Sequence, residues 1–166
     1  WTRLSPSGSA APAGRYAHGA IFDPPRNRML VFGGALTDGE AGDLWALAFT
    51  GAFKWTKLSP GGAPPAASSY HAVAYDGARQ RLVAFGGLRA TKDQVHAVTL
   101  SGSASWSEIV AVGQPPRART DHTAIYDAAR HRMIVYGGNS ESGVALDDAW
   151  EFSLTGTPGW TKLAPT

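Results

Sequence analysis

Three histidines recur at nearly equal spacing along the chain, and three imidazoles are enough to bind a metal ion. His18, His71 and His122 stand 53 and 51 residues apart. Three protein ligands with an open fourth position are the common arrangement of a catalytic zinc ion. Other residue types share this spacing, however, so the chemistry of the histidines has to be judged within a repeat.

The repeat is defined by several residue types that keep register over three copies. Each histidine is followed by an aspartate, an arginine and a glycine pair, and a tryptophan comes further along the chain. A pattern with this many matching positions indicates a repeat architecture. The repeated residues are Asp23, Asp76 and Asp127; Arg28, Arg81 and Arg132; Gly33-Gly34, Gly86-Gly87 and Gly137-Gly138; and Trp1, Trp55, Trp106 and Trp160.

Within each repeat the pattern predicts four strands and no helix. In the first repeat, a strand from about Tyr16 to Phe22 leads into a turn that begins at an aspartate. The second strand, 29–32, is apolar without alternation, which indicates burial on both faces. The third runs over 44–49 and the fourth over 55–58. Corresponding strands are expected at 82–85, 95–100 and 106–109, and at 133–136, 149–154 and 160–163.

Sheets that are apolar on both faces must pack against copies of themselves. This predicts an all-β propeller with one four-stranded antiparallel sheet in each blade. We expect blade 1 at residues 15–58, blade 2 at 69–109 and blade 3 at 120–163.

The residues resemble the kelch repeat, whose period is about 50 residues with a glycine pair and a downstream tryptophan. They are most similar to the bacterial form found in the central domain of galactose oxidase-like proteins, where Tyr-Asp-x-x-Arg-x-Arg precedes an apolar strand. That string stands at 75–81 and 126–132, whereas Phe22 replaces the tyrosine in the first repeat. The middle repeat departs from the pattern at His96, where the other repeats carry a tryptophan.

Three blades are fewer than the four to eight that close a propeller. Residues 1–4, Trp-Thr-Arg-Leu, match the fourth strand of a repeat and are expected to form the outer strand of a preceding blade. We therefore expect a longer ring of six or seven blades, whose remaining blades cover two apolar end faces. The alternative is a ring made of two copies, in which residues 1–4 and 160–163 would compete for one outer-strand position.

The repeated polar residues are expected to support the blades. Equivalent positions of successive blades lie around the ring and do not converge on one point, so the sequence predicts no metal site and no cofactor. We expect the histidines to bond the backbone at the start of the inner strand and the arginines to pair with nearby carboxylates or carbonyls. Each tryptophan supplies a large buried surface.

Function is expected where the repeats differ, on two sets of connections at one face. One set follows the glycine pairs, at 35–42, 88–93 and 139–147, and the other precedes the inner-strand histidines. The resemblance to kelch binders implies that these residues line the central face where ligands dock. Arginine can hold a carboxylate with two hydrogen bonds, and tyrosine offers rigid contact area. The candidate ligand-binding residues are Arg15, Tyr16, Ser69, Tyr70, Arg119, Asp121 and Asn139.

Three functions fit this sequence. The first is a non-catalytic scaffold that binds a protein, peptide or glycan, because no Gly-x-Ser-x-Gly elbow, phosphate loop, dinucleotide fingerprint or His-Glu-x-x-His string occurs. The second is the propeller part of a galactose oxidase-like or other kelch enzyme whose active residues lie outside this chain. Such copper radical enzymes use a tyrosine cross-linked to a cysteine, and this chain has no cysteine. The third is a structural spacer.

Composition narrows the partners. The formal charge is only +2 and no run of Lys or Arg occurs, so we expect no nucleic-acid partner. No apolar stretch approaches the roughly 20 residues of a membrane helix, so we expect no membrane partner.

The excess of Arg over Lys and the Ala-rich loops fit a bacterial source. A secreted or cell-surface location is an expectation from the resemblance alone, because a chain that begins at Trp1 shows no targeting segment.

Overall fold

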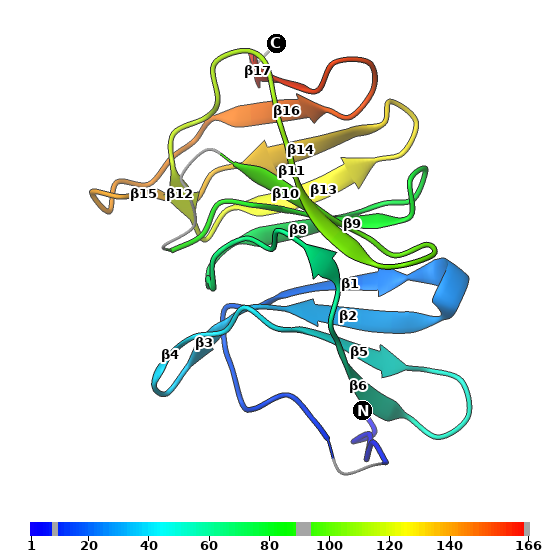
Figure 1. The fold of residues 1–166 in the computed structure, drawn as a ribbon. Coiled ribbons are helices and arrows are strands. Elements are labelled where there is room, and N and C mark those ends of the chain that lie inside the picture. Colours follow the sequence, from blue (N-terminus) through cyan, green and yellow to red (C-terminus); the bar gives the residue numbers. More distant parts are fainter. Residues whose placement is uncertain (8–9, 89–93, 165–166) are drawn as a thin grey trace.

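The chain folds into three blades, each built on four antiparallel strands (Figure 1). This is a computed structural model, and it describes residues 1–7, 10–88 and 94–164. Apart from the 3-10 turn η1 (Pro24–Arg26), no helix occurs in these ranges, which confirms the all-β prediction. Blade 1 consists of β1 (Gly19–Asp23), β2 (Arg28–Phe32), β5 (Leu44–Ala48) and β6 (Lys54–Leu58); blade 2 of β8 (Ala72–Asp76), β9 (Arg81–Phe85), β10 (Val95–Thr99) and β11 (Ser105–Ile109); blade 3 of β13 (Thr123–Asp127), β14 (Arg132–Tyr136), β16 (Ala149–Ser153) and β17 (Gly159–Leu163).

Short strands form two separate pairs and extend one blade. β3 (Ala35–Leu36) pairs with β4 (Gly39–Glu40), β12 (Arg119–Thr120) pairs with β15 (Asn139–Ser140), and β7 (Gly61–Gly62) runs parallel to β11. We call the end of the blades that carries β3, β4, β12 and β15 the loop end, and the end with the β1–β2, β8–β9 and β13–β14 turns the turn end. The loop end lies on the left of Figure 1 and the turn end on the right.

The first strand of each blade is shorter than expected, while the other strands lie within one residue of their predicted bounds. β1 begins at Gly19 and not at Tyr16, because Ala17 has a φ of 51° and the chain leaves the extended conformation there. Tyr70 and Asp121 take the same left-handed conformation at the equivalent positions of blades 2 and 3. The residue before each of them still pairs with the loop that follows its own glycine pair.

The blades pack face to face through two apolar clusters. Leu30 and Phe32 of blade 1 share one cluster with Leu82, Val98 and Trp106 of blade 2. The inner strands β1, β8 and β13 lie next to one another. The same contact recurs between blades 2 and 3, where the buried residues are Val83, Phe85, Val95, Met133, Phe152 and Trp160. This burial is the main stabilising contribution in such an array, because each blade contacts only its neighbours.

The segment before each blade runs along the outer strand of that blade. Ser7 pairs with Lys54, β7 pairs with β11, and Val112 pairs with Gly159, all in parallel. Residues 1–4 form no strand, and Trp1 is fully exposed. A strand needs a hydrogen-bonded neighbour, and each of the three blades already has its own fourth strand, so an outer strand at 1–4 in a preceding blade stays a prediction.

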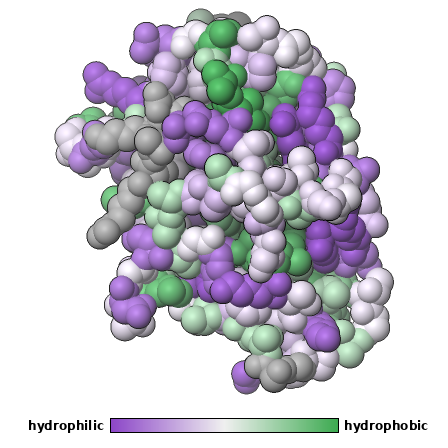
Figure 2. Space-filling model, in the orientation of Figure 1, coloured by the Kyte–Doolittle hydropathy of each residue, from purple (hydrophilic) through white to green (hydrophobic). Residues whose placement is uncertain are grey.

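One of the two end faces is less apolar than expected. On the forward face, which is the face of blade 3 that points away from blade 2, Ile125 and Tyr136 are more than half exposed. Beside them, however, stands Glu151, where blades 1 and 2 carry the buried Ala46 and Ala97. Figure 2 shows hydrophobic residues in small groups among polar ones on the face that is turned to the viewer in Figure 1.

Candidate functional site

A shallow pocket at the loop end is built from equivalent positions of all three blades. It is lined by the residues just before the inner strands and by the histidines that follow them. Two backbone hydrogen bonds connect the three left-handed residues in a series: Tyr70 N–H donates to Ala17 O at 2.8 Å, and Asp121 N–H donates to Tyr70 O at 3.0 Å. The expectation that equivalent positions do not converge is therefore wrong at this end. The lining residues are Tyr16, Ala17, His18, Tyr70, His71, Asp121 and His122.

Two tyrosines and one carboxylate give this pocket its chemistry. The rings of Tyr16 and Tyr70 meet edge to face with centroids 6.1 Å apart, and Tyr16 is 60% exposed. Asp121 is exposed and accepts a hydrogen bond from Asn139 Nδ2 at 3.3 Å. Desolvation raises the pKa of Tyr70, as do the neighbouring Tyr16, Asp121 and Glu40, so the phenol stays neutral at pH 7. These four predicted site residues thus lie together.

The buried lining of the pocket consists of two histidines that act as wedges between blades. A Cβ at Gly33 would lie 2.7 Å from His71 Cε1, and one at Gly86 would lie 2.5 Å from His122 Cε1. The first glycine of these two pairs therefore leaves room for the histidine of the next blade. Burial lowers the pKa of both histidines to about 4, while backbone contacts with Phe32 and Ser68 at His71, and with Phe85 at His122, act in the opposite direction. These contacts agree with the predicted side-chain bond to the backbone.

Arg15 and Arg119 do not face the pocket as free cations. The Arg119 guanidinium is buried and donates to both carboxylate oxygens of Asp148, at 2.8 and 3.2 Å, and to Gly137 O at 2.9 Å. Arg15 makes the same pair with Asp43 in blade 1. We had expected both arginines to grip a ligand carboxylate, and that assignment is corrected because their own blades already satisfy them.

The middle blade lacks this ion pair. Ser68 stands where the arginines stand, and its hydroxyl donates to Leu88 O at 2.6 Å. Gln94 takes the place of the aspartate and His96 that of the tryptophan. The candidate Ser69 is fully buried and its hydroxyl has no hydrogen-bond partner, so it lies behind the surface and not on it.

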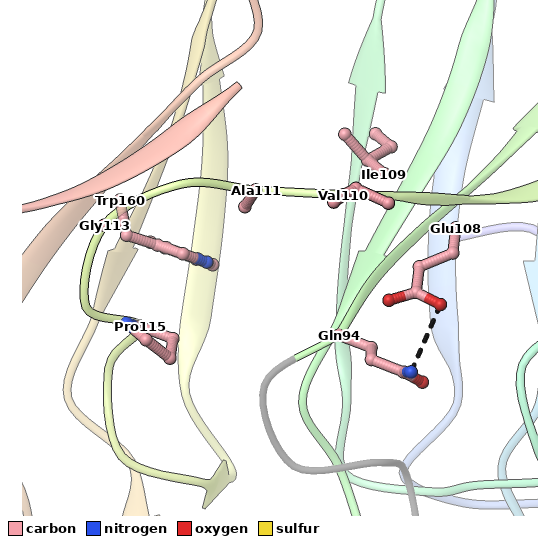
Figure 3. A pocket seen from close by; sticks show the side chains of 8 residues that line it. All are labelled: Gln94, Glu108, Ile109, Val110, Ala111, Gly113, Pro115 and Trp160. Atoms are coloured by element: carbon pink, nitrogen blue, oxygen red, sulfur yellow. Dashed lines mark hydrogen bonds between the residues drawn. The ribbon is translucent and has the colours of Figure 1, made fainter. Parts of the chain in front are cut away.

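A groove lies between blades 2 and 3 beside this replacement. Gln94 Nε2 donates to Glu108 Oε2 at 3.2 Å, and the buried Trp160 lies across from them (Figure 3). The equivalent groove between blades 1 and 2 is lined by Asp43, Lys57 and Trp106. Because the groove recurs wherever two blades meet, it reflects blade packing and gives no separate indication of a site.

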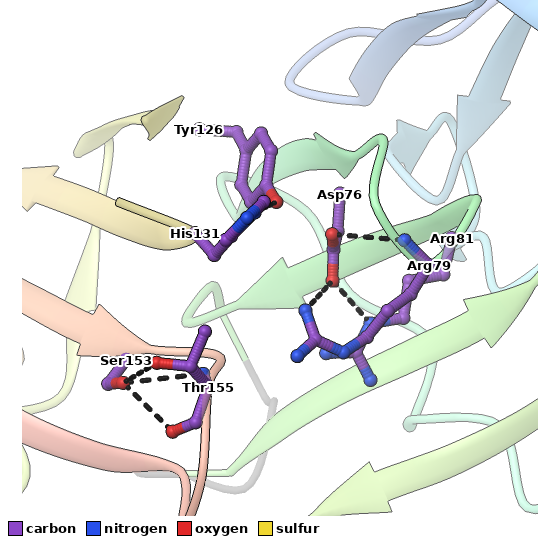
Figure 4. A network of polar contacts seen from close by, with 7 residues as sticks. All are labelled: Asp76, Arg79, Arg81, Tyr126, His131, Ser153 and Thr155. Carbon is purple, nitrogen blue, oxygen red and sulfur yellow. Dashed lines mark hydrogen bonds and ion pairs between the residues drawn. The ribbon is translucent and has the colours of Figure 1, made fainter. Parts of the chain in front are cut away.

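The turn end carries a second polar network that also repeats. Asp76 accepts hydrogen bonds from Arg79 and Arg81 of its own blade, at 3.3 and 2.9 Å (Figure 4). Tyr126 of the next blade contacts this network, and its pKa rises to about 12 through burial and then through the bond to Asp76. Asp23, Arg26 and Arg28 form the same pairs in blade 1, so the predicted structural role of the turn arginines is confirmed.

Sequence reasoning missed two features of the loop end. The left-handed backbone at Ala17, Tyr70 and Asp121 was not predicted, because none of these residues is a glycine. Glu40 was not singled out, although one of its carboxylate oxygens is buried without a partner and its charge acts on Tyr70 and His71.

Among the described residues, no group of three His, Asp or Glu is placed to hold a metal ion. Within the same ranges, no helix is long and apolar enough to cross a membrane. Residues 89–93 of the second predicted loop lie outside the described residues.

Comparison with known proteins identifies the repeat. The family profile described as KLHDC2/KLHL20/DRC7 Kelch-repeats domain matches residues 1–166. Host cell factor homolog hcf-1 of Caenorhabditis elegans is 31% identical over 82% of this chain and 20% of that protein. Acyl-CoA-binding domain-containing protein 5 of Arabidopsis thaliana is 33% identical over 65% of this chain and 16% of its own length.

A solved structure described as that of YjhT shares the fold. It aligns with a TM-score of 0.70 at 16% identity, over 96% of this chain and 48% of that one. The chain therefore spans about half of this structural neighbour and a fifth or less of the two relatives.

Proposed function

The chain belongs to the kelch-repeat family, and we propose that it is a non-catalytic module that binds a protein partner at its loop end. One observation carries this proposal: the loop end brings Tyr16, Tyr70 and Asp121 from three blades into one accessible pocket, and Asn139 donates a hydrogen bond to Asp121. Tyrosine is enriched in the energetically important centres of protein interfaces, because it offers large contact area at low entropic cost.

The other polar features of the described surface repeat between blades, so they are less suited to specific recognition than the loop end. The grooves between blades and the aspartate–arginine networks at the turn end recur from blade to blade. At the loop end, by contrast, the three positions before the histidines are Ala17, Tyr70 and Asp121, which differ in size and charge. The enzyme alternative and the likeness to galactose oxidase-like proteins remain predictions from the sequence.

Site-specific photo-crosslinking tests which end binds. A benzoylphenylalanine is placed at Thr37 or Val144, both exposed in loop-end connections, in cells of the source organism. Matched controls carry it at Ala78 or Ala128, both exposed at the turn end. We expect discrete protein adducts from Thr37 and Val144 and none from the controls. Adducts from the turn end alone, or from no position, would overturn the proposal.

A further inference from the structure

The charges around the loop-end pocket differ from what its arginines suggest. Arg15 is neutralised by Asp43 and Arg119 by Asp148, so neither cation is available to an acidic ligand. Asp121 is exposed at the pocket, and Glu40 keeps one buried carboxylate oxygen without a partner. Among the described residues, the uncompensated charge at this pocket is therefore negative.

The aromatic rings complete a site for a cation. Tyr16 and Tyr70 meet at an interplanar angle of 77°, so they form two walls of a corner. A positive charge is attracted to the face of an aromatic ring within about 6 Å of its centre. The Asp121 carboxylate, in the same pocket, can accept hydrogen bonds from an ammonium or guanidinium group at that corner.

The buried lining of the pocket does not oppose a cation. His71 and His122 stay neutral at pH 7, because burial lowers the pKa of each to about 4. Both histidines are more than nine-tenths buried and line the same pocket as the tyrosines. Neutral imidazoles carry no charge that would repel a basic group.

We propose that this pocket takes a lysine or arginine side chain of the partner protein, between the rings of Tyr16 and Tyr70 and against the carboxylate of Asp121. The inference rests on the proposed function and adds the chemistry of the partner to it. A basic side chain is favoured over an acidic one by charge complementarity, which mainly determines which partner is accepted.

Small probes test the chemistry directly. N-acetyl-lysine amide, N-acetyl-arginine amide, N-acetyl-norleucine amide and N-acetyl-glutamate amide are titrated into the isotope-labelled chain and followed by NMR. We expect the lysine and arginine probes to shift the amides of Tyr16, Tyr70 and Asp121 saturably, and the other two to leave them unchanged. Asp121→Asn and Tyr16→Ala should each weaken binding about fivefold, whereas Tyr16→Phe should retain it.

Asp147→Asn is the matched control, because Asp147 is an exposed acid at the loop end that does not line the pocket. It should bind the lysine probe as the unchanged chain does. Preferential binding of the glutamate probe, or equal binding by Asp121→Asn, would overturn the cation proposal. If crosslinks still formed from Thr37 and Val144 in that case, the binding module would stand and only its ligand class would fail.

Discussion

At the scale of single residues, the same polar group takes different roles at different ends of the blade. Arg119 forms an ion pair with Asp148, and the Trp150 indole also donates a hydrogen bond to this carboxylate, at 2.7 Å. The hydrogen bonds from Arg119 lower the pKa of Asp148 to about 2, so the carboxylate stays ionised at any ordinary pH. Because buried charges are paired in this way, the arginines hold the blade together and leave recognition to the tyrosines.

The two wedge histidines predict a specific pH dependence of stability. The folded pKa of His71 and His122 is about 4, below the value of about 6.5 expected in the unfolded chain. Between these values the unfolded state binds more protons, so the stability present above pH 6.5 is lost as the pH falls towards 4. We expect the free energy of unfolding to drop by about 1.4 kcal/mol per pH unit for each histidine.

Urea denaturation at several pH values between 6.5 and 4.5 measures this slope. His71→Asn should remove about half of it, because one of the two buried imidazoles is gone. His18→Asn is the comparison: His18 is exposed, and burial and the neighbouring Arg15 lower its pKa by a smaller amount, so this variant should remove less of the slope than His71→Asn. A slope that His71→Asn leaves intact would show that another group titrates in this range.

At the scale of the elements, the strands were predictable because their signal is local. Apolar runs such as 82–85 lie between an aspartate turn and a glycine pair, and β9 was found within one residue of its expected start. The left-handed Ala17 could not be predicted, since an alanine carries no preference for that conformation. It is held there by long-range contacts, among them the bond from Tyr70 N–H.

The residues that line the loop-end pocket could be anticipated from the sequence, but the contacts that engage them could not. Placing the site just before the histidines and after the glycine pairs was sufficient to find Tyr16, Tyr70, Asp121 and Asn139. The engagement of Arg119 was not accessible in the same way, because its partner Asp148 lies 29 residues further along the chain. Pairing at that distance depends on the register of the sheet.

Substitutions at the glycine pairs measure how much the contact between blades contributes to stability. Gly86 has a φ of 70°, and a Cβ there would clash with His122 Cε1 at 2.5 Å and with Arg119 O at 2.8 Å. Gly137 has nearly the same φ, 67°, but its Cβ would meet only Leu146 O at 3.3 Å. We expect Gly137→Ala to cost about 1 kcal/mol of stability through backbone strain alone.

Gly86→Ala should cost about 3 kcal/mol, because the added methyl also forces His122 out of its position between blades. Thermal and urea unfolding of the two variants give the difference directly. Equal losses for both would mean that the histidine wedge contributes little and that the strain of the left-handed backbone accounts for the glycine.

At the scale of the whole molecule, the forward face of blade 3 decides how the ring is completed. Its Tyr136 stands where Phe32 and Phe85 pack against the tryptophan of a following blade, with centroids 4.9 and 4.6 Å apart. Glu151, bonded to Arg132, lies on the same face in place of a buried alanine. A partner on this face must therefore accommodate an ion pair as well as a ring.

A second copy of the chain does not meet that requirement. The face of blade 1 that it would present carries Met29, Leu47 and Trp55, which are largely apolar. Burying an ion pair against such a surface costs more than the contact returns. We therefore propose that further kelch blades of a longer chain complete the ring, and we predict that the isolated 166-residue chain is a monomer.

Light scattering coupled to size exclusion tests this prediction, with a mass of 17.4 kDa expected for the monomer. Glu151→Ala restores the alanine of the other blades and removes the desolvation cost, so this variant should associate at lower concentration than the unchanged chain. Glu141→Ala, a change to an exposed acid outside the forward face, is the control and should remain a monomer. Twice the monomer mass for the unchanged chain would favour the ring of two copies, because the ion pair would then be tolerated within the contact.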